Sequence, residues 1–163
     1  MSLREIAGND HTLVLTWQVA CDLEKTWSAL TDPRSVAQWL GTVIEGDLGT
    51  ADHVVIDHGD GYLCRSALRR RDRPRAIEFT WSFPDEPAST VKITLDEEED
   101  ETTLRLVHEG LGPLLPSYRV GWCVHLTYLE AAALGQPLPP AMFWNLHETL
   151  TQFKSGDALA VDA

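Results

Sequence analysis

The sequence has few basic residues, no long apolar run and no closely spaced cysteine pair. Lys and Arg number 13 against 25 Asp and Glu, which gives a formal net charge of −12 at pH 7. Nucleic-acid binding needs a clustered excess of Lys and Arg, so the charge argues against nucleic acid and, equally, against an anionic membrane surface. No stretch approaches the roughly 18 apolar residues of a membrane span, and the first residues lack a signal-peptide core. We expect a cytoplasmic protein with no nucleic-acid and no membrane partner.

Recognisable metal, cofactor and catalytic motifs are also missing. Cys21, Cys64 and Cys123 are odd in number and widely spaced, so we expect buried free thiols rather than disulfides or structural zinc. There is no Gly-x-Ser-x-Gly elbow and no phosphate-binding loop, and the His-Glu pairs at 108–109 and 147–148 lack the second His of a zinc-protease motif. We therefore expect no cofactor and no metal, and assign no catalytic residue.

The residues that are present indicate a single domain that contains both strands and helices. A chain of 163 residues with 44% hydrophobic and 23% charged residues has the size and composition of a single globular domain. Alternation of apolar and polar residues at period two predicts strands. These are expected at 11–19, 42–45, 53–58, 62–70 and 75–83, and around 91–95 and 104–108.

Helical spacing predicts two short helices and one long one. Asp22 precedes a helix over 23–30, and Asp32-Pro33 opens a second, because each carboxylate can accept the free amide hydrogens of a first turn. A long helix from about 118 to 134 repeats apolar residues at helical spacing. A mainly antiparallel sheet with one apolar face needs a cover, and only the long helix is large enough to provide it. The fold class is therefore α+β, a curved antiparallel sheet that grips a long C-terminal helix.

A further amphipathic helix is expected at about 141–153, before a tail over 154–163. Its apolar face would consist of Phe143, Leu146, Leu150 and Phe153. The sequence leaves open whether this helix plugs a cavity, packs on the outside or mediates a homodimer.

Several motifs occur in a characteristic order. They are Thr26-Trp27, Ala29 to Pro33 and Trp39; Pro74 to Trp81; Thr102 to Leu106 with its His108-Glu-Gly110 ending; and Gly121-Trp122 followed by Leu126 and Leu129. Over about 11–138 the chain thus resembles the START-like, or SRPBCC, superfamily, and within it the group similar to the activator of heat-shock protein 90 ATPase. The resemblance implies one helix-grip domain over 1–163, with a cavity between helix and sheet that the superfamily uses for apolar ligands.

In such a fold, inward-facing aromatic residues and histidines would lie near the interface of helix and sheet. The expected ligand-binding residues are Trp39, His58, Phe79, Trp81, His108, Tyr118, Trp122 and His125. Rings with a polar edge suit a pocket that orients an apolar ligand, although the same rings could simply fill a core. The three imidazoles could likewise serve as acid/base groups or metal ligands, or be satisfied core histidines.

Three functions are compatible with these observations. The leading hypothesis is a domain that binds an apolar or aromatic small molecule without a cofactor. The second is a polyketide-cyclase-like or hydratase-like enzyme in which His108 or His125 moves a proton. The third is a chaperone-interacting module that uses the basic run 69–75 and the acidic run 96–101, which are otherwise solvated turns that partly compensate each other.

Overall fold

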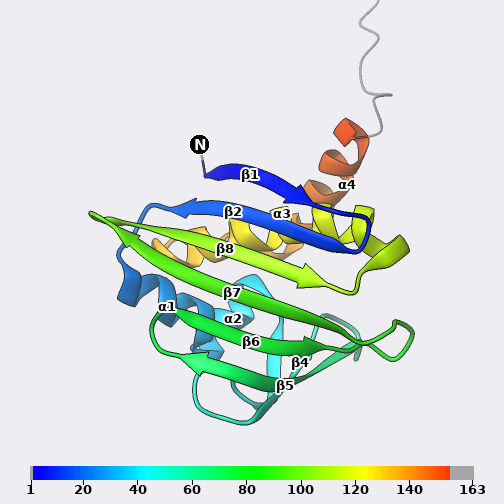
Figure 1. Ribbon diagram of the computed structural model, residues 1–163, viewed down its shortest axis with the longest axis horizontal. Helices are drawn as coiled ribbons and strands as arrows, with labels where there is room; N and C mark the ends of the chain where they lie inside the picture. The colour runs from blue at the N-terminus through cyan, green and yellow to red at the C-terminus, as the bar shows by residue number, and fades with distance from the viewer. Residues whose placement is uncertain (1, 155–163) are drawn as a thin grey trace, which may run out of the picture.

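Eight antiparallel strands form one curved sheet in the computed structural model, which describes residues 2–154 (Figure 1). The strand order across the sheet is β1-β2-β8-β7-β6-β5-β4-β3. The strands are β1 (Leu3–Gly8), β2 (Thr12–Val19), β3 (Thr42–Gly46), β4 (His53–Asp57), β5 (Leu63–Asp72), β6 (Ala76–Trp81), β7 (Ser89–Glu98) and β8 (Glu101–Glu109). The six strands from β3 to β8 follow one another as a meander, so the α+β sheet expected from the period-two pattern is confirmed.

One long helix covers a face of this sheet. Helix α3 (Leu115–Ala133) follows a short 3-10 turn at Gly112–Leu114 and runs behind β2 and β8 in Figure 1. Its buried residues, among them Trp122, Leu126 and Leu129, belong to the same apolar core as the inward faces of the strands. The helix-grip fold is therefore confirmed, and none of the described helices is long and apolar enough to cross a membrane.

The two short helices connect β2 to β3. Helix α1 (Leu23–Thr31) begins after Asp22, whose carboxylate accepts the amide hydrogen of Lys25 at 2.9 Å. Helix α2 (Pro33–Trp39) begins after Asp32, which caps it in the same way through Arg34 at 2.9 Å. Capping of this kind is typically worth about 1 kcal/mol. Both start signals in the sequence are confirmed, and α2 brings Trp39 against α3.

Strand β1 is not among the expected strands. It pairs with β2 in antiparallel register, with Ile6 opposite Leu15, and forms an edge of the sheet. Five of its six residues are exposed, and only Leu3 is half-buried. A strand without an apolar face has no period-two signal, so the sequence pattern begins only at β2, and the two short helices follow the second strand rather than the first.

The last helix is shorter and less buried than expected. Residues Pro140–Met142 form a 3-10 turn, and α4 runs from Phe143 to Lys154 against α3. Phe143 and Leu146 pack against the core, whereas Leu150 is 39% and Phe153 is 66% exposed. The predicted apolar face is thus wrong in its second half, because α4 diverges from the body after its first two turns. Residues 155–163 of the predicted tail lie outside the described residues.

The basic and acidic runs occupy the β5–β6 and β7–β8 turns, which lie at the same end of the meander. Their basic members pair elsewhere: Arg70 with Asp72 at 3.2 Å, and Arg73 with Glu24 of α1 at 3.2 Å. Within residues 2–154, no ion pair joins the basic run to the acidic one. The expected mutual compensation of the two runs is therefore not made by direct contact.

Candidate ligand pocket

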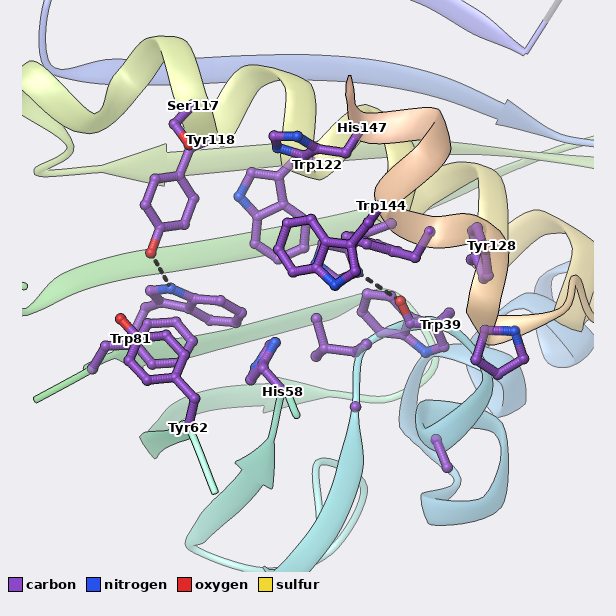
Figure 2. Close-up of a pocket in the computed structure, with 18 of the residues that line it drawn as sticks. Trp39, His58, Tyr62, Trp81, Ser117, Tyr118, Trp122, Tyr128, Trp144 and His147 are labelled. Carbon is purple, nitrogen blue, oxygen red and sulfur yellow. Dashed lines mark hydrogen bonds between the residues drawn. The ribbon is translucent and has the colours of Figure 1, made fainter. Parts of the chain in front are cut away.

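A pocket of about 390 Å³ lies where α2, α3 and α4 meet the ends of β4 and β6. Its walls are mainly aromatic, and Figure 2 shows rings from all three helices and from the sheet facing one space. A volume near 400 Å³ is at the lower end of the range for small-molecule sites. The pocket is therefore large enough for a compact ligand.

Six of the eight residues predicted from the sequence line this pocket. They are Trp39, His58, Trp81, Tyr118, Trp122 and His125. The three on α3 share a face with Gly121, since positions 118, 121, 122 and 125 follow helical spacing. Trp39 lies at the end of α2 and His58 just after β4. They share the pocket wall with His125 of α3, which is 86 positions after Trp39 in the sequence.

Phe79 and His108 do not reach the pocket. Phe79 is 1% exposed and precedes Trp81 by two positions on the same face of β6, with ring centres 6.4 Å apart. The pocket lies at the Trp81 end of the strand, so Phe79 fills the core below it. His108 is fully buried and does not line the pocket; its ring packs against those of Tyr118 and Trp122, with centres 4.9 and 6.0 Å away.

His108 is instead the centre of a buried hydrogen-bond chain. Trp122 Nε1–H donates to His108 Nδ1 at 2.9 Å, so this nitrogen carries no proton. The proton is then on Nε2, which donates to Ser89 Oγ at 2.7 Å, and Ser89 in turn donates to the Trp81 carbonyl at 3.4 Å. Burial lowers the pKa of His108 to about 3. The side chain is thus neutral, with both nitrogens satisfied, and it holds Trp122 in place.

A second hydrogen-bond chain begins at the indole of Trp81, whose backbone carbonyl ends the first. Trp81 Nε1–H donates to the Tyr118 hydroxyl at 2.9 Å (Figure 2), and that hydroxyl donates to Glu86. Burial, followed by the hydrogen bond to Glu86, raises the pKa of Tyr118 above its usual range. Tyr118 therefore remains a neutral phenol, and its proton is already engaged by a protein group.

His125 and His58 are the two imidazoles that do line the pocket. His125 Nδ1 lies 2.7 Å from the Trp39 carbonyl oxygen, which can only accept, so Nδ1 carries the proton. His58 Nε2 is buried and has no hydrogen-bond partner among residues 2–154. Burial is the main cause that lowers the pKa of His125 to about 4 and of His58 to about 3. Both rings are neutral at pH 7, and they lie 6.1 Å apart between centres.

Several lining residues were not predicted. Phe83 continues the inward alternation expected over 75–83, two positions after Trp81, but was not assigned to the site. Tyr62 and Glu86 lie outside the strands of the structure, and Tyr62 donates its hydroxyl proton to Asp85. Phe143, Trp144 and His147 come from α4, and Figure 2 shows Trp144 and His147 beside Trp122 at the mouth of the pocket. The amphipathic pattern of this helix was visible, but its docking site on α3 was not.

The described lining residues offer little charge. Glu86 provides their only carboxylate, and none of them is Lys or Arg. Within residues 2–154, no group of three or more His, Cys, Asp or Glu side chains is placed to hold a metal ion. The chemistry available in the pocket consists of apolar contact, aromatic stacking and hydrogen bonds to neutral groups.

The curved sheet, the gripped helix and the pocket between them define a START-type helix-grip protein. Residues 20–133 match the family model described as activator of Hsp90 ATPase homolog 1-like protein. The match covers well over half of the chain, so the protein belongs to this family. Among curated proteins, none matches the sequence.

Solved structures of similar proteins agree with this fold. CalU16 from Micromonospora echinospora is 24% identical, with a TM-score of 0.71, over 89% of this chain and 86% of CalU16. DynU16, from the dynemicin biosynthetic locus, is 26% identical with a TM-score of 0.71 over 80% of this chain, which spans about half (49%) of DynU16. MLL2253 from Mesorhizobium loti is 23% identical with a TM-score of 0.70, over 78% of this chain and 99% of that protein.

Proposed function

We propose that the protein binds a compact aromatic or apolar small molecule in the pocket beneath α3 and α4. The single observation that carries this proposal is an accessible space of about 390 Å³ lined by rings from α2, β6, α3 and α4. Filling it would have stabilised the protein, since unfilled apolar space forfeits packing contacts. A space kept open among aromatic side chains is typical of a ligand site.

The kinship with DynU16 supports a small-molecule role. That protein is described as belonging to a biosynthetic locus, and its structure matches 80% of this chain. The proposal includes the cytoplasmic location and the single-domain organisation expected from the sequence. It assigns Trp39, His58, Trp81, Trp122 and His125 to ligand contact.

The arrangement gives less support to catalysis by His108. Proton transfer needs a group that can reach the reacting atom and that titrates near the working pH. His108 is fully buried, both of its nitrogens are hydrogen-bonded, and its pKa is about 3. Of the two histidines considered from the sequence as proton-transfer groups, only His125 lines the pocket and can contact a ligand.

Gly121 provides a direct test of binding in the pocket. It lies on the pocket face of α3, and a Cβ placed there would meet nothing within 4 Å. Gly121→Leu should fill the pocket without unfolding the protein, because Gly costs a helix interior about 1 kcal/mol relative to better helix formers. The matched control is Thr127→Leu, at an exposed position of the same helix.

The experiment is a calorimetric titration with 2-methoxynaphthalene, a neutral two-ring probe. We expect saturable binding to the wild type and to Thr127→Leu, and at least tenfold weaker binding to Gly121→Leu with its circular dichroism spectrum unchanged. Equal binding by all three proteins would place the probe elsewhere. An absence of binding to the wild type would count against the proposed function itself.

A further inference from the structure

The polar groups of the pocket divide into those already engaged and those left free. Trp81 and Tyr118 use their polar hydrogens within the protein, on Tyr118 and Glu86 respectively. The exposed side chains of Gln38 and Ser117 lie at the rim, where water can satisfy them. Among the described lining residues, what remains are the imidazoles of His58 and His125 and, on α4, the imidazole of His147 and the indole N–H of the exposed Trp144. Of these, His58 and His125 are the pair that lies between the sheet and α3.

The free nitrogen of His125 is an acceptor. Its Nδ1 is committed as a donor to the Trp39 carbonyl at 2.7 Å, and a neutral imidazole carries only one proton. Nε2 of this ring therefore presents a lone pair and has no hydrogen-bond partner within the described chain. A group that fills this position has to donate a hydrogen bond.

His58 provides the second unsatisfied nitrogen. Its ring is held edge-on between Trp81 and Phe83, with ring centres 5.4 and 5.0 Å away, and Figure 2 shows it reaching from the end of β4 toward the space between Trp81 and Trp39. Nε2 is fully buried, and no group in the described part of the chain forms a hydrogen bond with it. A buried polar atom without a partner costs about 1–3 kcal/mol, so its retention in a pocket wall points to a partner that arrives with the ligand.

The separation of the two rings is compatible with one oxygen atom lying between their nitrogens. Two rings that each place a nitrogen about 2.8 Å from the same oxygen have centres at most roughly 8 Å apart, and those of His58 and His125 are 6.1 Å apart. A hydroxyl can donate its proton to one nitrogen and accept from the other, which no ether, carbonyl or carboxylate can do.

The charge of the pocket lining favours a ligand with a hydroxyl group over one with a carboxylate. The pocket wall contains the carboxylate of Glu86 and no Lys or Arg, and the chain as a whole carries a formal charge of −12. An anion would therefore enter against the field, with no cation to compensate its desolvation. Neutral imidazoles also offer less to a carboxylate than to an O–H donor.

We propose that the ligand is a neutral hydroxylated aromatic compound, whose phenolic hydroxyl donates to His125 Nε2 and lies against His58 Nε2 while its rings stack among Trp39, Trp81 and Trp122. This inference rests on the proposed function and names the ligand class for the same pocket. Fatty acids and other carboxylates are the class that it excludes.

The test compares three probes of the same shape by calorimetry at pH 7: 2-naphthol, 2-methoxynaphthalene and 2-naphthoate. They differ in having a neutral donor, no donor, and a negative charge. We expect 2-naphthol to bind about tenfold more tightly than its methyl ether, as one additional hydrogen bond provides, and 2-naphthoate to bind more weakly than both.

The variants His125→Phe and His58→Phe keep an aromatic ring and remove the nitrogens. In His125→Phe the ratio of the affinities for 2-naphthol and its methyl ether should fall to within about twofold; His58→Phe should reduce this ratio in part. Equal affinity of the wild type for 2-naphthol and the ether, a preference for 2-naphthoate, or a preference that survives in both variants would each overturn the assignment and leave a binding pocket in place. Binding of none of the probes would overturn the proposed function together with this inference.

Discussion

The buried neutral state of His108 makes a quantitative prediction about acid stability. Its pKa is about 3 in the folded protein, because burial disfavours the charged ring, whereas a histidine in an unfolded chain titrates near 6.5. As the pH falls from 7 to 5, the unfolded state gains about 0.7 of a proton at this site and the folded state gains almost none. Stability therefore falls as the pH falls, by about 2 kcal/mol for this one group.

His108→Gln isolates this contribution. A glutamine amide can accept from Trp122 Nε1 through its oxygen and donate to Ser89 through its nitrogen, so it replaces both hydrogen bonds without titrating. Between pH 7 and pH 5, the free energy of unfolding of the wild type should fall by about 2 kcal/mol more than that of the variant. His58, His125 and the carboxylates are common to both proteins, so their contributions cancel.

The assay is urea denaturation followed by tryptophan fluorescence at pH 7, 6 and 5. His11→Gln is the control, since it removes an exposed imidazole and leaves the buried His108 in place. It should follow the wild type at every pH. If His108→Gln lost as much stability on acidification as the wild type, His108 would not be held neutral in the core, and the hydrogen-bond chain through it would be misassigned.

Two further substitutions test the interior and an edge of the sheet. Ser89→Ala leaves His108 Nε2–H without an acceptor and should cost about 1–3 kcal/mol in urea denaturation; an unchanged midpoint would contradict the chain. Gly8→Ala places a Cβ 1.9 Å from the Thr12 carbonyl oxygen at a φ of +127°, and should lower the melting temperature more than Gly59→Ala does, where φ is +122° and nothing lies within 4 Å. Equal losses would show that steric contact at Gly8 plays no part.

A strand could be predicted from the sequence where one of its faces is buried, because burial leaves an alternating pattern of apolar residues. β2, β6 and β7 have one buried face, so their apolar residues alternate, and the carboxylates of Asp22 and Asp32 mark the starts of α1 and α2. β1 has five exposed residues out of six, and pairing through the backbone alone leaves no pattern in its side chains. It could not be found from periodicity.

The sequence predicts which side chains of the candidate site face the interior, but not which of them reach the pocket. Periodicity places Phe79 and Trp81 on one face of β6, yet only Trp81 lies at the end of the strand where the helices leave a space. The same limit applies to His108, which faces inward as expected but is fully buried and does not line the pocket. Whether an inward side chain reaches the pocket depends on where α2 and α4 pack. Trp144 is the clearest example, because it lines the pocket from a helix whose position no local sequence pattern specifies.

The most direct test of binding in the pocket uses the six tryptophans as reporters. Trp39, Trp81, Trp122 and Trp144 line the pocket, whereas Trp17 and Trp27 do not. In a titration of ¹⁵N-labelled protein with 2-naphthol, the indole Nε1–H signals of the four pocket tryptophans should shift together and saturate, and the other two should stay in place. Signals that do not move, or six that move alike, would contradict the account that this pocket is the ligand site.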